Sequence, residues 1–150
     1  MASARISAAP KEKNMVEVGL ARIVINETSD EQVIVLKEKG GKRSFPIVIG
    51  IFEALAINRI VNGRQLPRPL THELLVSVVH TLGGKITRCV VTELKNNTYF
   101  ALLSVERNGQ TFEIDSRPSD AITLALHEGA QIFVDESVMD AVATEEDPTV

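Results

Sequence analysis

Residues 115–120 (DSRPSD) place two carboxylates and an arginine within six residues, directly before an apolar run. Pro118 suits the first turn of a helix, because a missing N–H costs nothing there. Ser119 and Asp120 then fall in that first turn, where hydroxyl and carboxylate groups can satisfy free backbone N–H groups. The spacing predicts a helix with polar side chains held at its entrance, where they can contact a ligand. An ordinary well-capped helix has the same pattern.

A second candidate segment, residues 68–72 (RPLTH), precedes another predicted helix. A helix N-terminus disfavours imidazolium, so we expect His72 to be neutral and able to act as a base. Arg68 and Arg117 each precede a proline at a helix entrance, where a guanidinium beside exposed N–H groups is a good phosphate receptor. A surface histidine and two structural ion pairs account for these residues equally well.

The elements that must position these side chains follow from hydrophobic periodicity and turn residues. Alternating, Val- and Ile-rich runs predict strands over 15–26, 32–37, 44–49, 85–94, 98–106, 110–115 and 131–134. Helical spacing predicts helices over 51–61, 72–82, 118–127 and, as one or two turns, 137–143. Asn108-Gly109 between two strands is typical of a tight hairpin.

Two of the predicted helices carry expectations about burial. The helix over 51–61 is apolar on nearly every side and is expected to be buried. The helix over 72–82 is expected to be capped by Thr71 and to present one apolar face. That face comprises Leu74, Leu75, Val78, Val79 and Leu82.

The order of elements suggests an internal duplication, in which three strands and a helix occur twice. Phe45 and Phe112 begin the third strand of each half, and an acid, Glu53 or Asp120, follows eight residues later. Chance similarity between two amphipathic units is the alternative. If the duplication is real, two carboxylate-bearing helix N-termini lie near one another around a pseudo-twofold axis. Hard cations take oxygen ligands, so such an arrangement would make a divalent-metal site plausible.

These observations predict an α+β fold: two β-β-β-α units with an inserted helix, and a mixed or antiparallel sheet packed on few helices. We expect a single domain over 15–143, a disordered leader over 1–14 and a disordered acidic tail over 144–150. No apolar run approaches the ~20 residues of a membrane span. Cys89 is the single cysteine. It is expected to be a small core residue, and the lack of disulfides fits the reducing cytoplasm.

Charge is unevenly distributed along the chain. The net charge of −4 argues against broad electrostatic binding of nucleic acid. Between residues 37 and 88, however, only Glu38, Glu53 and Glu73 oppose a run of basic residues, whereas Arg117 is the lone base from Glu113 onward. The middle of the chain can therefore meet an anion, although ordinary solvated charge would give the same pattern.

Three motifs carry a family resemblance: IGIFEALAI over 49–57, RPLTHELL over 68–75 and DSRPSDAITLA over 115–125. In this order they resemble the bifunctional nuclease (BFN) domain family, and the resemblance covers about residues 15–140. It implies an α+β fold with several strands and few helices. It also implies a nuclease that acts on DNA and RNA.

The preferred hypothesis is a cytoplasmic phosphodiesterase, a hydrolase of low sequence specificity. Mg²⁺ or Mn²⁺ would activate water and steady the leaving oxygen. Its ligands would be three carboxylates: Glu53, Asp115 and Asp120. His72 would be general base or acid alongside Asp120, and Arg68 and Arg117 would hold the phosphate.

The rival hypothesis is a non-catalytic, oligomeric binding or regulatory module. The same polar residues would then form a structural salt-bridge network. The paucity of aromatic residues, which are only Phe and Tyr99, favours this rival, because single-strand binders usually offer stacking platforms. A third alternative is an enzyme acting on a small phosphate or nucleotide. Under each hypothesis we expect a homo-oligomer, formed through a sheet edge or a helix face, and no membrane partner.

Overall fold

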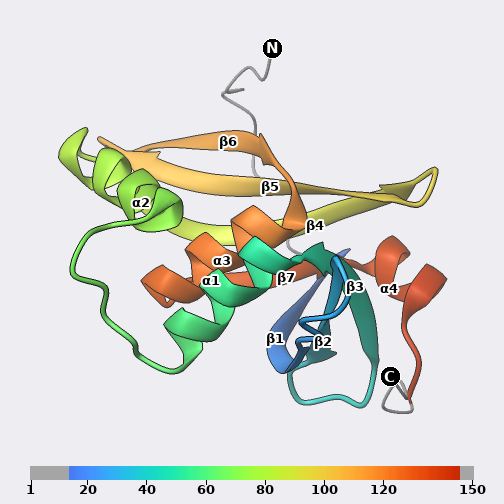
Figure 1. Cartoon of the computed structure of the whole chain (residues 1–150). Coiled ribbons are helices and arrows are strands. Elements are labelled where there is room, and N and C mark those ends of the chain that lie inside the picture. The colour runs from blue at the N-terminus through green and yellow to red at the C-terminus, as the bar shows by residue number, and fades with distance from the viewer. Residues whose placement is uncertain (1–13, 146–150) are drawn as a thin grey trace.

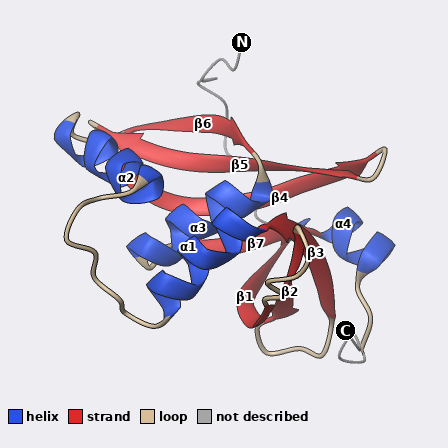
Figure 2. Cartoon of the chain, in the orientation of Figure 1, coloured by secondary structure: helices blue, strands red, loops and turns tan. Residues whose placement is uncertain are grey.

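The computed structural model describes residues 14–145, which form one seven-stranded sheet with four helices (Figures 1 and 2). The strands are β1 (Met15–Val24), β2 (Glu31–Glu38), β3 (Ser44–Gly50), β4 (Lys85–Lys95), β5 (Thr98–Arg107), β6 (Gln110–Ser116) and β7 (Gln131–Asp135). The helices are α1 (Ile51–Val61), α2 (Thr71–Thr81), α3 (Pro118–Glu128) and α4 (Glu136–Val142). The predicted α+β class is confirmed.

The sheet consists of two antiparallel meanders joined by a late strand. The strand order is β3-β2-β1-β7-β4-β5-β6. β7 pairs antiparallel with β1 and parallel with β4, so the sheet is mixed and the two meanders run in opposite directions. A helix follows the third strand of each meander, α1 after β3 and α3 after β6. This is the predicted order of two β-β-β-α units with α2 inserted between them; a common origin of the halves stays a prediction.

Turn chemistry sets the hairpins of the second meander. Asn108 and Gly109 both have positive φ, at 50° and 76°. Two consecutive left-handed residues match the right-handed twist of the strands that they join. Asn96 and Asn97 make the preceding turn in the same way, at 52° and 59°. Asparagine tolerates this region better than most other non-glycine residues. The residues of each turn therefore determine the conformation of both hairpins.

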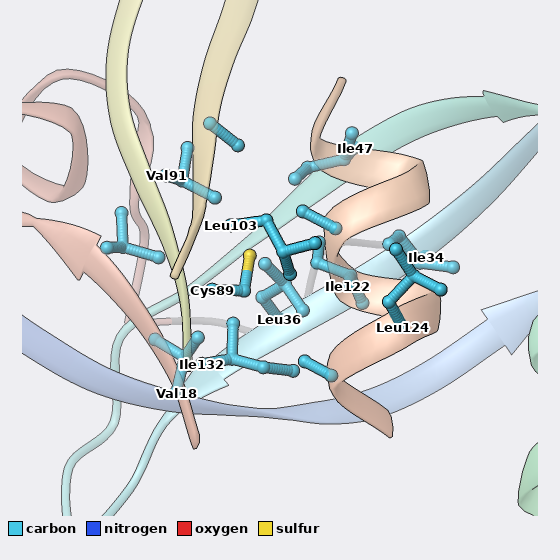
Figure 3. Packing of buried hydrophobic residues seen from close by; sticks show 14 of the residues in the cluster. Val18, Ile34, Leu36, Ile47, Cys89, Val91, Leu103, Ile122, Leu124 and Ile132 are labelled. Atoms are coloured by element: carbon cyan, nitrogen blue, oxygen red, sulfur yellow. The ribbon is translucent and has the colours of Figure 1, made fainter. Parts of the chain in front are cut away.

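The core lies between the curled sheet and α3. Ala121, Ile122, Leu124 and Ala125 of α3 are each at most 1% exposed. Figure 3 shows Ile122 and Leu124 beside Cys89, Leu103 and Leu36, which come from strands of both meanders. Burial raises the pKa of the Cys89 thiol to about 12. The prediction that Cys89 is a small core residue is confirmed.

The prediction that α1 is buried on nearly every side is wrong. Its buried residues are Ala54, Ala56 and Ile57, whereas Phe52 in the first turn is 81% exposed. Leu55, one turn further along, is also exposed. α1 packs mainly on α3, and this contact needs only one side of the helix.

α2 leaves most of its predicted apolar face uncovered by the described part of the chain. Val76 is its one fully buried residue. Of the predicted apolar face, Val79 packs against the core, whereas Leu74, Leu75, Val78 and Leu82 are exposed. Thr71 is the first residue of the helix rather than its cap, since the preceding Leu70 has extended backbone and no side chain caps the helix. Apolar periodicity identifies a face, but it does not say that the same chain covers it.

The predicted leader over 1–14 and the predicted tail over 144–150 lie mostly outside the described residues. Of the predicted leader, only Asn14 is described, and the predicted tail after Glu145 lies outside the described range. Thr144 exchanges two backbone hydrogen bonds with Ser44, of 2.8 and 2.9 Å. This bridge extends ordered structure one residue past the expected domain end at Ala143. No helix between residues 14 and 145 has the length and apolar character needed to cross a membrane.

Candidate active site

A cleft of about 760 Å³ lies where the N-terminal turns of α1, α2 and α3 meet the end of β6. Five of the six predicted site residues line it, and four of them are Glu53 from α1, His72 from α2, Asp115 at the end of β6 and Asp120 from α3. Arg117 lines it as well. Residues far apart in the chain are therefore gathered at one place, as the three sequence motifs predicted.

The entrance of α3 directs Asp120 into this cleft. Arg117 has extended backbone, Pro118 is the first helical residue, and no side chain caps the helix. The prediction that Asp120 satisfies the free N–H groups of its own helix is therefore wrong. Its two carboxylate oxygens bond to side chains of α2 and of residue 117 instead.

Asp120 is the centre of a chain of four polar side chains. His72 Nε2 lies 3.0 Å from Asp120 Oδ1, and Arg117 Nε donates to Asp120 Oδ2 at 2.9 Å. Arg117 Nη2 also donates to Glu53 Oε1 at 2.9 Å. The series His72–Asp120–Arg117–Glu53 therefore joins the entrances of all three helices, and we call it the polar relay.

The polar relay shifts the pKa values of Asp120 and Arg117. The hydrogen bond from His72 is the largest cause that lowers the pKa of Asp120, and Arg117 lowers it further against the opposing effect of burial. Hydrogen bonds to Glu53 and Asp120 raise the pKa of Arg117. Asp120 is thus an ionised acceptor at neutral pH.

The ionised state of Asp120 determines which ring nitrogen of His72 carries a proton. An ionised carboxylate only accepts hydrogen bonds, so Nε2 of His72 must be the donor. In a neutral imidazole the lone pair is then on Nδ1. Nδ1 has no hydrogen-bond partner among residues 14–145. His72 can therefore accept a proton at Nδ1 while Asp120 holds the ring.

Two predicted residues lie outside the polar relay. Asp115 is exposed in the cleft, and its carboxylate has no partner among the described residues. Arg68 is exposed on the loop before α2 and is not part of the cleft wall. The structure thus brings together Glu53, His72, Asp115, Arg117 and Asp120, but not Arg68.

Arg59 of α1 is a cleft residue that the sequence motifs missed. It lies 3.8 Å from Glu73 of α2, measured from Nη2 to Oε1, and it lines the cleft with Phe52 and Leu55. Positions 52, 55, 56 and 59 share one face of a helix at the i, i+3, i+4, i+7 spacing. The interval of seven residues from Phe52 was the sequence signal that places Arg59 on this face.

As they lie, the three predicted metal ligands do not fit a cation. No group of three or more His, Cys, Asp and Glu side chains between residues 14 and 145 is placed to hold a metal ion. Glu53 and Asp120 both bond the guanidinium of Arg117, which already compensates their charge. Mg²⁺ or Mn²⁺ at these carboxylates stays a prediction, and it requires Arg117 to release them.

Comparisons with a family model and with known proteins point to the same family. The family model described as the bifunctional nuclease domain matches residues 34–147. An uncharacterised protein of Mycobacterium tuberculosis is 35% identical over 125 residues, which are 83% of this chain and 74% of that protein.

Plant proteins named as nucleases are more distant. Bifunctional nuclease 1 of Arabidopsis thaliana is 30% identical over 97 residues, which are 62% of this chain and 30% of the plant protein. Bifunctional nuclease 1 of Oryza sativa is 24% identical over 105 residues, and the match covers 67% of this chain and 32% of the rice protein. The match thus spans about a third of these plant proteins.

Proposed function

Because this chain belongs to the bifunctional nuclease domain family, we propose that it hydrolyses phosphodiester bonds of DNA or RNA with low sequence specificity. The observation that carries the proposal is the polar relay. A histidine with a free ring nitrogen, a carboxylate that orients it and an exposed arginine line one cleft. General base, orienting group and phosphate receptor are the parts that a hydrolytic site needs.

In this proposal His72 removes the proton of the attacking water through Nδ1. The water oxygen forms a new bond to phosphorus, the bond from phosphorus to one sugar oxygen breaks, and that leaving oxygen takes a proton from solvent. Asp120 holds the tautomer and stabilises the imidazolium that forms, as a carboxylate does in other histidine-based sites. The polar relay supports this division of roles, since Asp120 bonds Nε2 and leaves Nδ1 without a partner among the described residues. Proton transfer of this kind contributes typically 10²–10⁴-fold to a rate.

Arg117 is suited to hold the phosphate. Its side chain is 65% exposed, and Nε and Nη2 are the nitrogens that bond Asp120 and Glu53. Nη1 has no partner among the described residues, so its two N–H groups can donate to a phosphate oxygen. Charge-assisted bonds of this kind are stronger than neutral ones and stabilise negative charge that grows in the transition state.

Phe52 supplies the stacking platform that the sequence seemed to lack. Its ring is 81% exposed and belongs to the cleft wall beside Glu53. An exposed ring beside a phosphate receptor suits an unpaired base, because base–aromatic stacking is tolerant of sequence. Single-stranded DNA or RNA is therefore the substrate form that the cleft favours.

The test is cleavage of end-labelled single-stranded DNA and RNA by wild-type protein and by His72→Ala and Asp120→Asn. We expect losses of about 100-fold or more in both variants. His80→Ala is the matched control: His80 is on the same helix, is half exposed and is not part of the cleft wall. Equal cleavage by wild type and His72→Ala would point to a contaminating nuclease and would refute the assignment.

An EDTA arm of the same assay tests the metal prediction separately. Loss of cleavage in EDTA, with recovery in Mg²⁺ or Mn²⁺, supports a cation that displaces Arg117 from Glu53 and Asp120. Unchanged cleavage in EDTA refutes the metal prediction and leaves the roles of His72 and Arg117 intact.

One observation favours the rival, a non-catalytic binding or regulatory module. The carboxylates of Glu53 and Asp120 are both taken up by Arg117, as a structural salt-bridge network requires. Asp115 does not fit this alternative, because its exposed carboxylate has no such partner. Absence of cleavage by the wild type under all metal conditions, with retained binding of labelled oligonucleotide, would support the rival.

A further inference from the structure

The outward side of α2 is an apolar surface that nothing in the described chain covers. Its large side chains share high exposure: Leu70 49%, Leu74 55%, Leu75 43%, Val78 44% and Leu82 62%. We call these five residues the α2 face. Added together, the exposed fractions correspond to about two and a half fully exposed residues, or an area on the order of 400 Å². The largest apolar patch on a monomeric protein typically has this size and is often functional.

The α2 face carries no charge. The ionisable residues of the helix all point to other helices of the same chain: His72 to Asp120, Glu73 to Arg59 and His80 to Glu128. The helix contains no lysine or arginine. A helix that lies on a membrane surface needs a basic polar side, so a lipid surface does not suit α2.

An uncharged face suits a second copy of the same chain. In a twofold dimer the same patch lies on both partners, so no opposite charge is needed on either. A standard interface buries roughly 800 Å² per partner, of which somewhat more than half is apolar. The α2 face supplies most of that apolar area by itself.

The spacing within the α2 face fits helix-on-helix packing. Leu74, Val78 and Leu82 follow one another at intervals of four residues, which forms a ridge of the kind that interdigitates with an equivalent ridge. We propose that the protein forms a twofold dimer in which α2 packs against α2 of a second copy. Leu70 and Leu75 also line the cleft, so each cleft lies at the border of the dimer interface. The proposal does not depend on nuclease activity.

The first experiment measures mass in solution by sedimentation velocity and light scattering between about 1 and 100 µM. We expect twice the 16.4 kDa of the single chain. Leu74→Glu places a charge in the interface and should raise the dissociation constant by about 100-fold or more. Val48→Glu is the control, because Val48 is 59% exposed on β3, away from the α2 face.

The second experiment locates the interface by cross-linking. Val78→Cys should form an intermolecular disulfide under mild oxidation, whereas Val48→Cys should not. The native Cys89 is buried and does not compete. A monomeric wild type at the highest concentration, or a Leu74→Glu variant that dimerises like the wild type, would overturn the proposal. Co-sedimentation of a monomeric wild type with phosphatidylcholine–phosphatidylglycerol vesicles would overturn it in favour of a lipid surface.

Discussion

Arg117 Nη2 lies 2.9 Å from Glu53 Oε1, across 64 residues of chain. This contact joins the entrance of α3 to the entrance of α1, the helices that follow the two meanders. The equivalent acid of the second half, Asp120, bonds the same guanidinium. One arginine therefore holds the corresponding carboxylates of both β-β-β-α units, which is the proximity that the apparent duplication predicted.

Arg117→Lys should separate function from stability. A lysine keeps the charge but cannot donate to Glu53, Asp120 and a phosphate at once. We expect cleavage to fall by about 10-fold or more, while the exposed position limits the loss of unfolding free energy to less than ~1 kcal/mol. Initial rates and urea unfolding measure the two effects. Arg68→Lys, on the exposed loop, should change neither, and an equal loss in both variants would contradict the special role of Arg117.

Asp120→Asn should be less stable than wild type only where Asp120 is ionised. The pKa of Asp120 is lowered from its ordinary value of 3.8 in the folded state, so its stabilisation is full above that value and is lost as pH falls through the folded pKa. We expect a difference of about 1–2 kcal/mol at pH 7. The difference should vanish well below pH 4, as measured by urea unfolding at each pH. Asp115→Asn is the control and should lose little stability at pH 7, because the Asp115 carboxylate has no partner among the described residues.

Gln32→Leu should destabilise the turn between β1 and β2. Gln32 is 1% exposed, and its Nε2 donates to the carbonyl oxygens of Asn26 and Ser29 at 2.8 and 2.6 Å. Its Oε1 accepts from the backbone N–H of Asn26. Leucine fills the space but removes the partners of the Ser29 carbonyl oxygen and the Asn26 N–H, whereas the Asn26 carbonyl oxygen keeps the N–H of Ser29. We therefore expect a loss of about 1–3 kcal/mol. Thermal and urea unfolding measure it, and an unchanged stability would mean that water replaces the amide.

Gly84→Ala should also be destabilising, because the turn between α2 and β4 is tightly packed. A Cβ there would lie 3.0 Å from Val105 Cγ1 and 3.2 Å from the carbonyl oxygen of Val79. We expect a loss of about 1–3 kcal/mol from overpacking. Gly19→Ala is the control, since its Cβ would meet nothing closer than Lys39 Cε at 3.6 Å. Similar stabilities of the two variants would show that the turn can relax.

Local signals made much of the fold predictable. Asn108-Gly109 marks its hairpin, and Pro118 marks the start of α3, because each residue type fits only a few backbone conformations. The place of β7 was not predictable, since nothing in the order of the chain says that a late strand enters between β1 and β4. The outward orientation of α2 was missed for a related reason, because periodicity describes one helix and not its neighbours.

The candidate site was predictable in its residue types and less so in its contacts. His72 and Asp120 were singled out from different motifs, and the structure places them 3.0 Å apart. The sequence did not show that Asp120 would bond His72 rather than cap its own helix. It also pointed to Arg68, which lies in a loop whose position depends on long-range packing. It missed Arg59, because the sequence does not show that this face of α1 lies next to α2.

The position of β7 has a consequence for biosynthesis. β1 and β4 do not pair with each other, and both find their missing neighbour in a strand that ends at Asp135. While the chain is being translated, each meander therefore exposes an unpaired edge until the final residues of the domain leave the ribosome. The two meanders can pair into one sheet only once β7 has formed, so truncation before β7 would leave an unpaired edge at β1 and another at β4.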